Sequence, residues 1–123
     1  MTKGENYDKI QLLNLIERFI VVEIDVKRVG LTGLLVKASG RLDLDNAVEY
    51  GAKVKETIED NEEIDELILD FAQITFISSF GLKVILELHK DMALKGSMKL
   101  RNVPEAIVKS FKMVGFDKFL VIE

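Results

Sequence analysis

The stretch LILDFAQITFISSFGLKVIL, residues 67–86, changes its hydrophobic pattern halfway along, and this change indicates a strand followed by a helix. Its first five residues form a short apolar run, which is typical of a central strand covered on both faces. After two serines, Leu82 and Ile85 begin an apolar stripe at helical spacing. The stretch therefore predicts a buried strand, a junction at Ser78 and Ser79, and then a helix.

Two strands are predicted before this stretch. Apolar and charged residues alternate over residues 22–27, which indicates a half-buried strand, and residues 34–39 indicate a second one. The connection between them contains Gly30 and Gly33 and is too short for a crossover. We therefore expect the two strands to form an antiparallel hairpin.

Helices and strands alternate through the rest of the chain. Residues 40–46 are predicted to form a loop, and a helix follows whose apolar face runs from Ala47 to Ile58. Asp45 or Asn46 is the predicted N-cap of that helix. Two further strands, separated by a helix, close the sequence. This order predicts an α/β fold with a mostly parallel sheet and one antiparallel edge strand.

The N-terminal residues predict one more helix, outside this alternation. Residues 8–19 place an apolar stripe from Leu12 to Phe19 on one helical face. We expect this stripe to be buried, either against the sheet or in a homodimer against a second copy. The expected organisation is an amphipathic extension over residues 1–19 and a single domain over residues 20–123.

Composition and charge exclude several classes of function. The chain has 123 residues, 48% apolar and 31% charged, as in a soluble protein of one domain. No stretch of about 18 apolar residues is present, so we expect no membrane-spanning segment. The net charge of −4 opposes a general affinity for nucleic acid. The absence of cysteine and of a secretion signal favours a cytoplasmic protein.

No catalytic or metal-binding motif is present, so we expect neither an enzyme nor a cofactor. The single histidine, His89, follows the two serines, but no G-x-S-x-G sequence surrounds them to support a Ser-His-acid triad. Asp70 would suit a response-regulator receiver as its phosphoacceptor. That interpretation is disfavoured, because a receiver also needs an acidic pair at the end of its first strand and a lysine at the end of its last.

Three stretches in order resemble the STAS domain family, and in particular its anti-sigma factor antagonists. SGRLDLDNA, residues 39–47, is similar to the G-x-L-D loop of the family. Residues 67–86 are similar to its strand, its linker and its D-S-[ST]-G-L phosphorylation motif. The closing strand, helix and strand complete the pattern, and the resemblance covers residues 20–122. It implies the STAS fold, with the residues before it as an additional helix.

The resemblance also implies roles for individual residues. With Gly81 aligned on the glycine of the motif, Ser79 takes the position of the phosphoacceptor. Ser78 stands where the antagonists usually have aspartate, and Phe80 stands where they have serine or threonine. Asp43 matches the aspartate that lies beside the phosphoacceptor in the family.

The function implied is that of a bacterial regulator that acts by binding. Unphosphorylated, it would engage an anti-sigma factor with serine-kinase activity through Asp43, Ser78, Phe80 and Gly81 and so release a sigma factor. Phosphorylated at Ser79, it would lose this partner. Alternatives stay open: one serine serves only as a helix N-cap, Phe80 faces the core, and the protein is a scaffold or complex-assembly subunit that is never phosphorylated.

Overall fold

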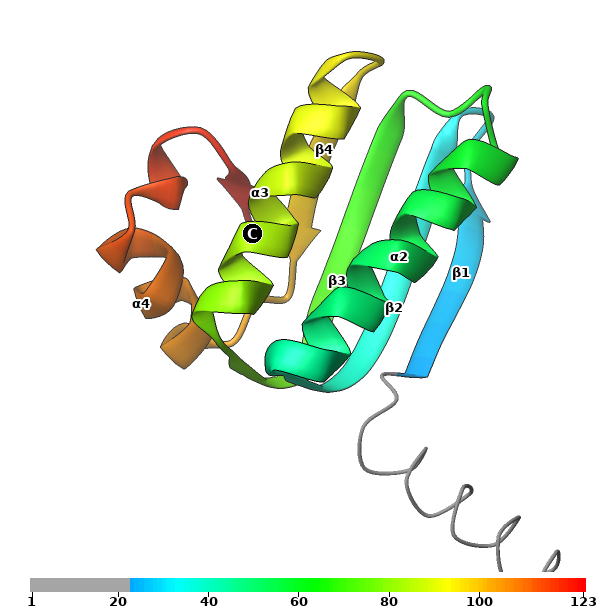
Figure 1. Ribbon diagram of the computed structural model, residues 1–123. Helices are drawn as coiled ribbons and strands as arrows, with labels where there is room; N and C mark the ends of the chain where they lie inside the picture. The colour runs from blue at the N-terminus through cyan, green and yellow to red at the C-terminus, as the bar shows by residue number, and fades with distance from the viewer. Residues whose placement is uncertain (1–22) are drawn as a thin grey trace, which may run out of the picture.

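The computed structural model describes residues 23–123, which form one five-stranded sheet and the helices packed on it (Figure 1). The predicted helix over residues 8–19 lies outside the described residues and stays a prediction. In chain order the elements are β1 (Glu23–Val29), β2 (Gly33–Leu42), α2 (Leu44–Asp60), β3 (Glu66–Ile77), α3 (Ser79–Ala93), β4 (Ser97–Arg101), α4 (Glu105–Met113), the 3-10 helix η1 (Phe116–Lys118) and β5 (Val121–Ile122).

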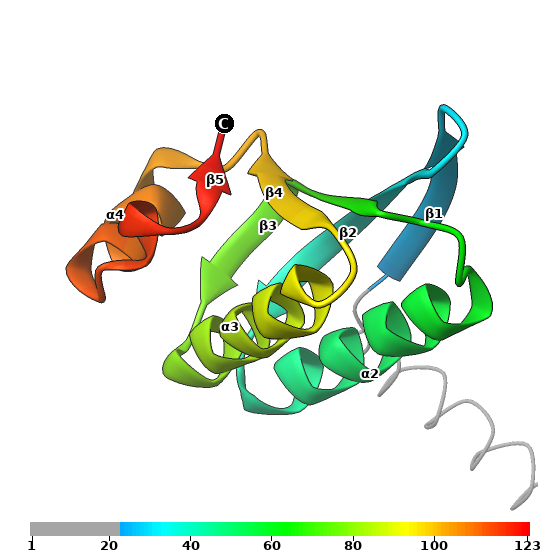
Figure 2. The same cartoon turned by 90° about the horizontal axis from the view of Figure 1, so that it is seen from above.

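The sheet has the mixed topology that the sequence predicted. Its strands lie in the order β1-β2-β3-β4-β5, with β1 antiparallel to β2 and every other neighbouring pair parallel. Figure 2 shows α2 and α3 next to each other on the same side of the sheet. Phe71 of β3 meets Tyr50 of α2 and Phe111 of α4 with ring centroids 6.4 and 6.3 Å apart. Because one side chain of β3 contacts both of them, α2 and α4 cover the same face of β3.

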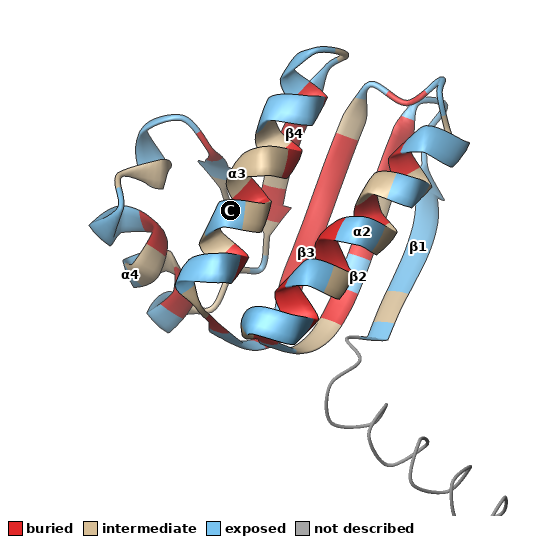
Figure 3. Ribbon diagram, in the orientation of Figure 1, coloured by how far each residue is buried: buried red, intermediate tan, exposed pale blue. Residues whose placement is uncertain are grey.

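The hydrophobic core lies between this face and the helices. Figure 3 shows the buried residues along β2, β3 and β4 and along the inner sides of α2 and α3. The apolar faces predicted for α2 and α3 are confirmed as buried. Side chains three or four residues apart fall on one side of a helix, so each helix turns one apolar face toward the sheet. The largest fully buried side chains are Tyr50, Phe71, Phe111, Leu34, Leu42, Ile64, Leu67, Ile68, Leu69, Ile74, Ile85 and Leu88.

The edge strand β1 is more exposed than its sequence predicted. Ile24 packs partly against the core, but Val26 is 40% exposed. Figure 3 shows β1 almost entirely in the colour of exposed residues, at the edge of the sheet beyond α2. A strand at the edge has a neighbour on one side only, so alternation in its sequence does not guarantee that one face is covered.

Strands β2 and β3 both run further than predicted. β3 has 12 residues against 10 in β2, and the register between them shifts after Lys37 and after Gly40. At the first shift the amide N–H of Ala72 donates to Asp70 Oδ1 at 2.9 Å. Such bulges interrupt the two-residue alternation of a strand, so the second half of β3 resembles a linker when only the sequence is read.

The start of α2 corrects the predicted loop and N-cap. The prediction of a loop over residues 40–46 was wrong, because β2 continues to Leu42 and α2 begins two residues later. The N-cap is Asp43, whose side chain accepts a hydrogen bond from Asn46 N, and not Asp45 or Asn46. The two predicted caps lie inside the first turn, where Asn46 is buried and donates from Nδ2 to the carbonyl oxygen of Arg41 at 2.9 Å.

Candidate functional site

The ends of β2 and β3 place the first turns of α2 and α3 next to each other. Leu42 pairs with Ile77 in the parallel register, and one N-cap residue follows each strand. These caps are Asp43 before α2 and Ser78 before α3. Strand pairing therefore unites two segments that are distant in the sequence, and both of them contain predicted site residues.

Ser78 connects the two helix starts through its backbone and its side chain. Its amide N–H and its hydroxyl both donate to the carbonyl oxygen of Leu42, each at 2.9 Å. The hydroxyl oxygen also accepts the N–H of Gly81 at 3.2 Å. This last bond satisfies one of the N–H groups that have no partner inside the helix. Of the two serines, Ser78 is therefore the N-cap.

Gly81 lets the first turn of α3 pack closely against the end of β2. A Cβ atom at this position would lie 2.6 Å from Ile77 Cγ1 and 2.9 Å from the carbonyl oxygen of Leu42. Both distances are shorter than non-bonded atoms normally allow, so a larger residue would force the helix start to move. The glycine of the motif thus has a packing role, which the sequence pattern alone did not explain.

Ser79 differs from Ser78 in its surroundings. It is the first residue of α3, and its side chain is exposed, whereas Ser78 is half-buried. The N–H groups and the dipole at the start of a helix favour a negative charge there. The hydroxyl of Ser78 therefore forms structural hydrogen bonds, whereas the side chain of Ser79 is exposed to the solvent.

Asp43 contributes a half-buried carboxylate to the same place. One oxygen accepts the N–H of Asn46 at 3.4 Å, and the other lies 4.0 Å from Nε of Arg41. The side chains of Arg41 and Asp43 are 58% and 45% exposed, so this ion pair contributes little to stability. Because Asp43 directly follows Leu42, its carboxylate stands next to the carbonyl that holds Ser78.

Exposed apolar side chains accompany these polar groups. Phe80 and Leu44 are each 49% exposed, which rules out the interpretation that Phe80 faces the core. Phe76 is 39% exposed, and the guanidinium of Arg41 lies 4.3 Å from the centroid of its ring. Aromatic side chains and arginine are enriched in protein interfaces relative to the rest of the surface.

Sequence reasoning missed three of the residues at this site. Leu44 and Arg41 fell in the predicted loop, and Phe76 fell in the predicted linker. Arg41 and Phe76 meet because they are register partners between β2 and β3. A signal for Leu44 existed, because Asp43 is also a preferred type of N-cap residue, and a cap at that position puts Leu44 in the first turn of the helix.

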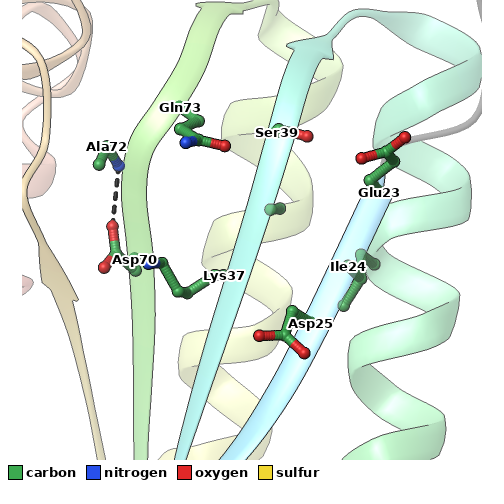
Figure 4. Close-up of a pocket in the computed structure, with 9 residues that line it drawn as sticks. Glu23, Ile24, Asp25, Lys37, Ser39, Asp70, Ala72 and Gln73 are labelled. Atoms are coloured by element: carbon green, nitrogen blue, oxygen red, sulfur yellow. Dashed lines mark hydrogen bonds between the residues drawn. The ribbon is translucent and has the colours of Figure 1, made fainter.

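A hollow of about 320 Å³ lies away from these helix starts, on β1, β2 and β3 at the first bulge (Figure 4). Asp70, one of its lining residues, is only 6% exposed. Its Oδ1 accepts the Ala72 N–H at 2.9 Å, and its Oδ2 accepts from Asn102 Nδ2 at 3.2 Å. The carboxylate thus supplies a partner to a backbone group at the bulge. It is not the exposed phosphoacceptor that a receiver requires.

His89 and Ser79 are too far apart to act together. They are separated by ten residues within α3, which span roughly 15 Å at about 1.5 Å per residue. The imidazole instead packs on Phe119, with ring centroids 5.1 Å apart. A catalytic triad that includes these two residues is therefore excluded by the geometry.

The described residues offer neither a metal site nor a membrane-spanning helix. Within residues 23–123, no three histidine, cysteine, aspartate or glutamate side chains lie close enough together to hold a metal ion. None of the helices in this range has the length and apolar character needed to cross a lipid bilayer.

Comparison with known proteins identifies the fold. A sequence profile of the STAS domain matches residues 23–123. SpoIIAA, a Bacillus cell fate determinant solved in its phosphorylated form, is similar at 20% identity over 82% of this chain and 91% of that chain, with a TM-score of 0.63. An anti-sigma factor antagonist from Mycobacterium paratuberculosis is similar at 18% identity over 82% of this chain and 84% of that one, with a TM-score of 0.73.

The same fold also occurs inside a transporter. The murine anion transporter Slc26a9 is similar at 16% identity over 89% of this chain and 21% of that chain, with a TM-score of 0.67. At identities this low, structural likeness establishes the fold and leaves the function to be argued from the residues of the site.

Proposed function

The chain belongs to the STAS domain family, and from this premise we propose that it is an anti-sigma factor antagonist. In this role it binds an anti-sigma factor with serine-kinase activity and is switched off by phosphorylation of Ser79. It contributes no catalytic group, and any nucleotide belongs to the kinase. The observation that carries the proposal is the exposed hydroxyl of Ser79 beside the exposed ring of Phe80, at the start of α3.

The switch rests on a difference between the free and the bound protein. A phosphate adds about −1.5 to −2 charges at neutral pH. At the exposed start of α3 the fold tolerates this charge, since a favourable contact with the helix dipole is worth about 0.3–1 kcal/mol. In an interface the same charge must lose its water, and a buried charge without a partner costs about 3–5 kcal/mol.

These magnitudes predict a strong effect on binding and a weak one on folding. Each 1.4 kcal/mol corresponds to about a tenfold change in affinity, so the complex should weaken by two or more orders of magnitude. The neighbouring carboxylate of Asp43 adds repulsion to a phosphate on Ser79. The phosphorylated protein should therefore remain folded while it loses its partner.

The test uses the intact protein and a purified anti-sigma factor with serine-kinase activity from the same organism. Intact-mass analysis after incubation with the kinase and ATP should show one added phosphate, which Ser79→Ala abolishes and Ser78→Ala retains. Calorimetric titration should show that Ser79→Glu binds the kinase at least 100-fold more weakly and Ser79→Ala binds it normally. Phosphate on Ser78, or normal binding by Ser79→Glu, would contradict the proposed switch.

A second candidate function is that of a STAS scaffold or complex-assembly subunit that is never phosphorylated. Two residues favour it. Ser78, in the position usually held by aspartate, is fully engaged as a cap, and Phe80 presents an apolar ring where the antagonists have a hydroxyl. Intact-mass analysis of the protein recovered from its native cell separates the two functions, because only the first predicts a phosphorylated fraction.

A further inference from the structure

The outer sides of α2 and α3 enclose a groove of about 350 Å³ that starts next to Ser79. The two helices contribute side chains at matching intervals of three or four residues, so the groove follows both helix axes for about two turns. Its lining residues are Val48, Gly51, Ala52, Lys55, Phe80, Lys83, Val84 and Glu87.

The groove exists because the helices approach closely at one point beneath it. A Cβ atom on Gly51 would lie 2.9 Å from Val84 Cγ1, so α2 and α3 are in van der Waals contact at the floor of the groove. Val48 and Phe80 lie one turn before this contact, on α2 and α3 respectively, and are 62% and 49% exposed. Leu44 lies one turn before Val48 on α2 and extends the apolar end of the groove. Its exposed fraction, 49%, equals that of Phe80.

Charged side chains line the rest of the groove in a fixed order. Lys83 follows Phe80 along α3 and forms no ion pair with any other residue of the range 23–123. Further along, Nζ of Lys55 lies 3.8 Å from Glu87 Oε2 and 4.0 Å from Asp91 Oδ2. Glu87 in the lining and Asp91 one turn beyond it share one ammonium group, so the acidic charges of this cluster exceed the basic ones by one.

The backbone of the groove decides what kind of segment fits. Inside α2 and α3 the backbone N–H and C=O groups are bonded within each helix, so no free row of donors and acceptors is offered to a partner strand. A helix satisfies its backbone hydrogen bonds internally, so it needs no donors or acceptors from the groove. Two adjacent helices also present the ridges and grooves against which a third helix packs.

We propose that this groove binds one amphipathic helix of the anti-sigma factor kinase. The proposal rests on the proposed function and names the contact that the partner makes. The helix places apolar side chains against Val48 and Phe80, an acidic residue against Lys83, and a basic residue against Glu87 and Asp91. Because its apolar end adjoins Ser79, the groove explains why a phosphate there would face a closely packed surface.

The test is a calorimetric titration of the purified kinase with the full chain and with two matched valine variants. Val48→Lys places a charge in the groove, whereas Val121→Lys places it on β5, where the valine is 54% exposed. Since both valines are more than half exposed, both variants should fold normally. We expect Val48→Lys to weaken binding at least 30-fold and Val121→Lys to change it less than twofold. Lys83→Glu should weaken binding at least fivefold.

Kinetics give a second readout of the same contact. With Val48→Lys as substrate, the kinase should show a raised KM for phosphorylation of Ser79 and an unchanged kcat, because the groove binds the kinase and does not take part in phosphoryl transfer. An unchanged KM would contradict the proposal.

The possible outcomes separate this inference from the proposed function. If Ser79→Glu weakens binding but Val48→Lys does not, the regulatory function stands and the groove is not its interface. If the kinase does not bind the wild-type chain at all, both are wrong. If Val48→Lys instead dissociates a dimer in light scattering, and deletion of residues 1–18 does the same, the groove holds a second copy of this chain and the proposal is wrong.

Discussion

Ser78 and Leu42 join the starts of two helices through a single carbonyl oxygen. That oxygen accepts both the amide N–H and the hydroxyl of Ser78 at 2.9 Å. The same hydroxyl caps α3, so one small side chain links β2, β3 and α3. The side chain of the neighbouring Ser79 is exposed and takes no part in these bonds. Substitutions of the two serines should therefore have different effects on stability.

Replacing each serine by alanine should give unequal losses of stability. Ser78→Ala removes the helix cap and one of the two bonds to Leu42, so the free energy of unfolding should fall by about 1–3 kcal/mol. Ser79→Ala removes an exposed hydroxyl and should change it by no more than about 0.5 kcal/mol. Urea denaturation monitored by circular dichroism measures both. Equal losses would mean that the two hydroxyls share the cap.

The glycine of the motif should be intolerant of a methyl group. Gly81→Ala drives a Cβ against Ile77 and the carbonyl of Leu42, so we expect a loss of about 1–3 kcal/mol in the free energy of unfolding. Phe80→Ala is the control. It removes a half-exposed ring from the preceding position in the same turn and should lower the free energy of unfolding by less. A Gly81→Ala protein as stable as the wild type would show that the helix start can shift freely.

The buried hydroxyl of Tyr50 should be dispensable. Tyr50 is fully buried against Phe71, burial raises the pKa of its phenol, and the hydroxyl has no hydrogen-bond partner among residues 23–123. Tyr50→Phe should therefore leave the free energy of unfolding unchanged or raise it by up to about 1 kcal/mol. Tyr50→Ala, which also removes the ring, should lower it by about 3–5 kcal/mol. Thermal unfolding of both variants distinguishes the two groups, and a large loss in Tyr50→Phe would reveal a partner for the hydroxyl.

Glu63 should give a small dependence of stability on pH at the end of the molecule opposite to the site. A hydrogen bond from the Arg28 guanidinium lowers the pKa of Glu63. A carboxyl group whose folded-state pKa is lowered stabilises the protein above its unfolded pKa of about 4.3, and this stabilisation is lost as the pH falls through the lower, folded-state value. Glu63→Gln should therefore have a slightly lower Tm than the wild type at pH 7, and the gap should close near pH 3.

The neighbouring residue supplies the control for this pH effect. Glu62→Gln removes an exposed charge of the same sign that makes no ion pair with the rest of the described chain, so its Tm should follow the wild type at both pH values. Because Arg28 and Glu63 are both exposed, added salt should shrink the effect of Glu63→Gln at pH 7. A gap that persists at pH 3 would assign the effect to packing instead of charge.

Local patterns were enough to predict the order of the strands and α-helices within residues 23–123. The apolar run at residues 67–71 and the stripe that begins at Leu82 differ in period, and period is set by neighbours in the chain. The short turn between β1 and β2 likewise left only an antiparallel hairpin. The sequence motif also placed Ser78, Ser79, Phe80 and Gly81 at the start of a helix, which the structure confirms.

The composition of the site was decided by contacts between distant segments. Asp43 caps α2 through a local bond to Asn46, but its neighbour Leu42 binds Ser78 only because β2 and β3 pair up to Leu42 and Ile77 after two register shifts. No local period reveals such shifts, since they depend on hydrogen bonds between strands. Neighbouring residues in the chain were therefore enough to predict the strands and α-helices of residues 23–123 and their order, though not the short 3-10 helix η1. Contacts between segments that are far apart in the chain account for the rest. They bind Ser78 to Leu42, bring aromatic rings to the surface and form the groove between α2 and α3, and no pattern of neighbouring residues reports such packing.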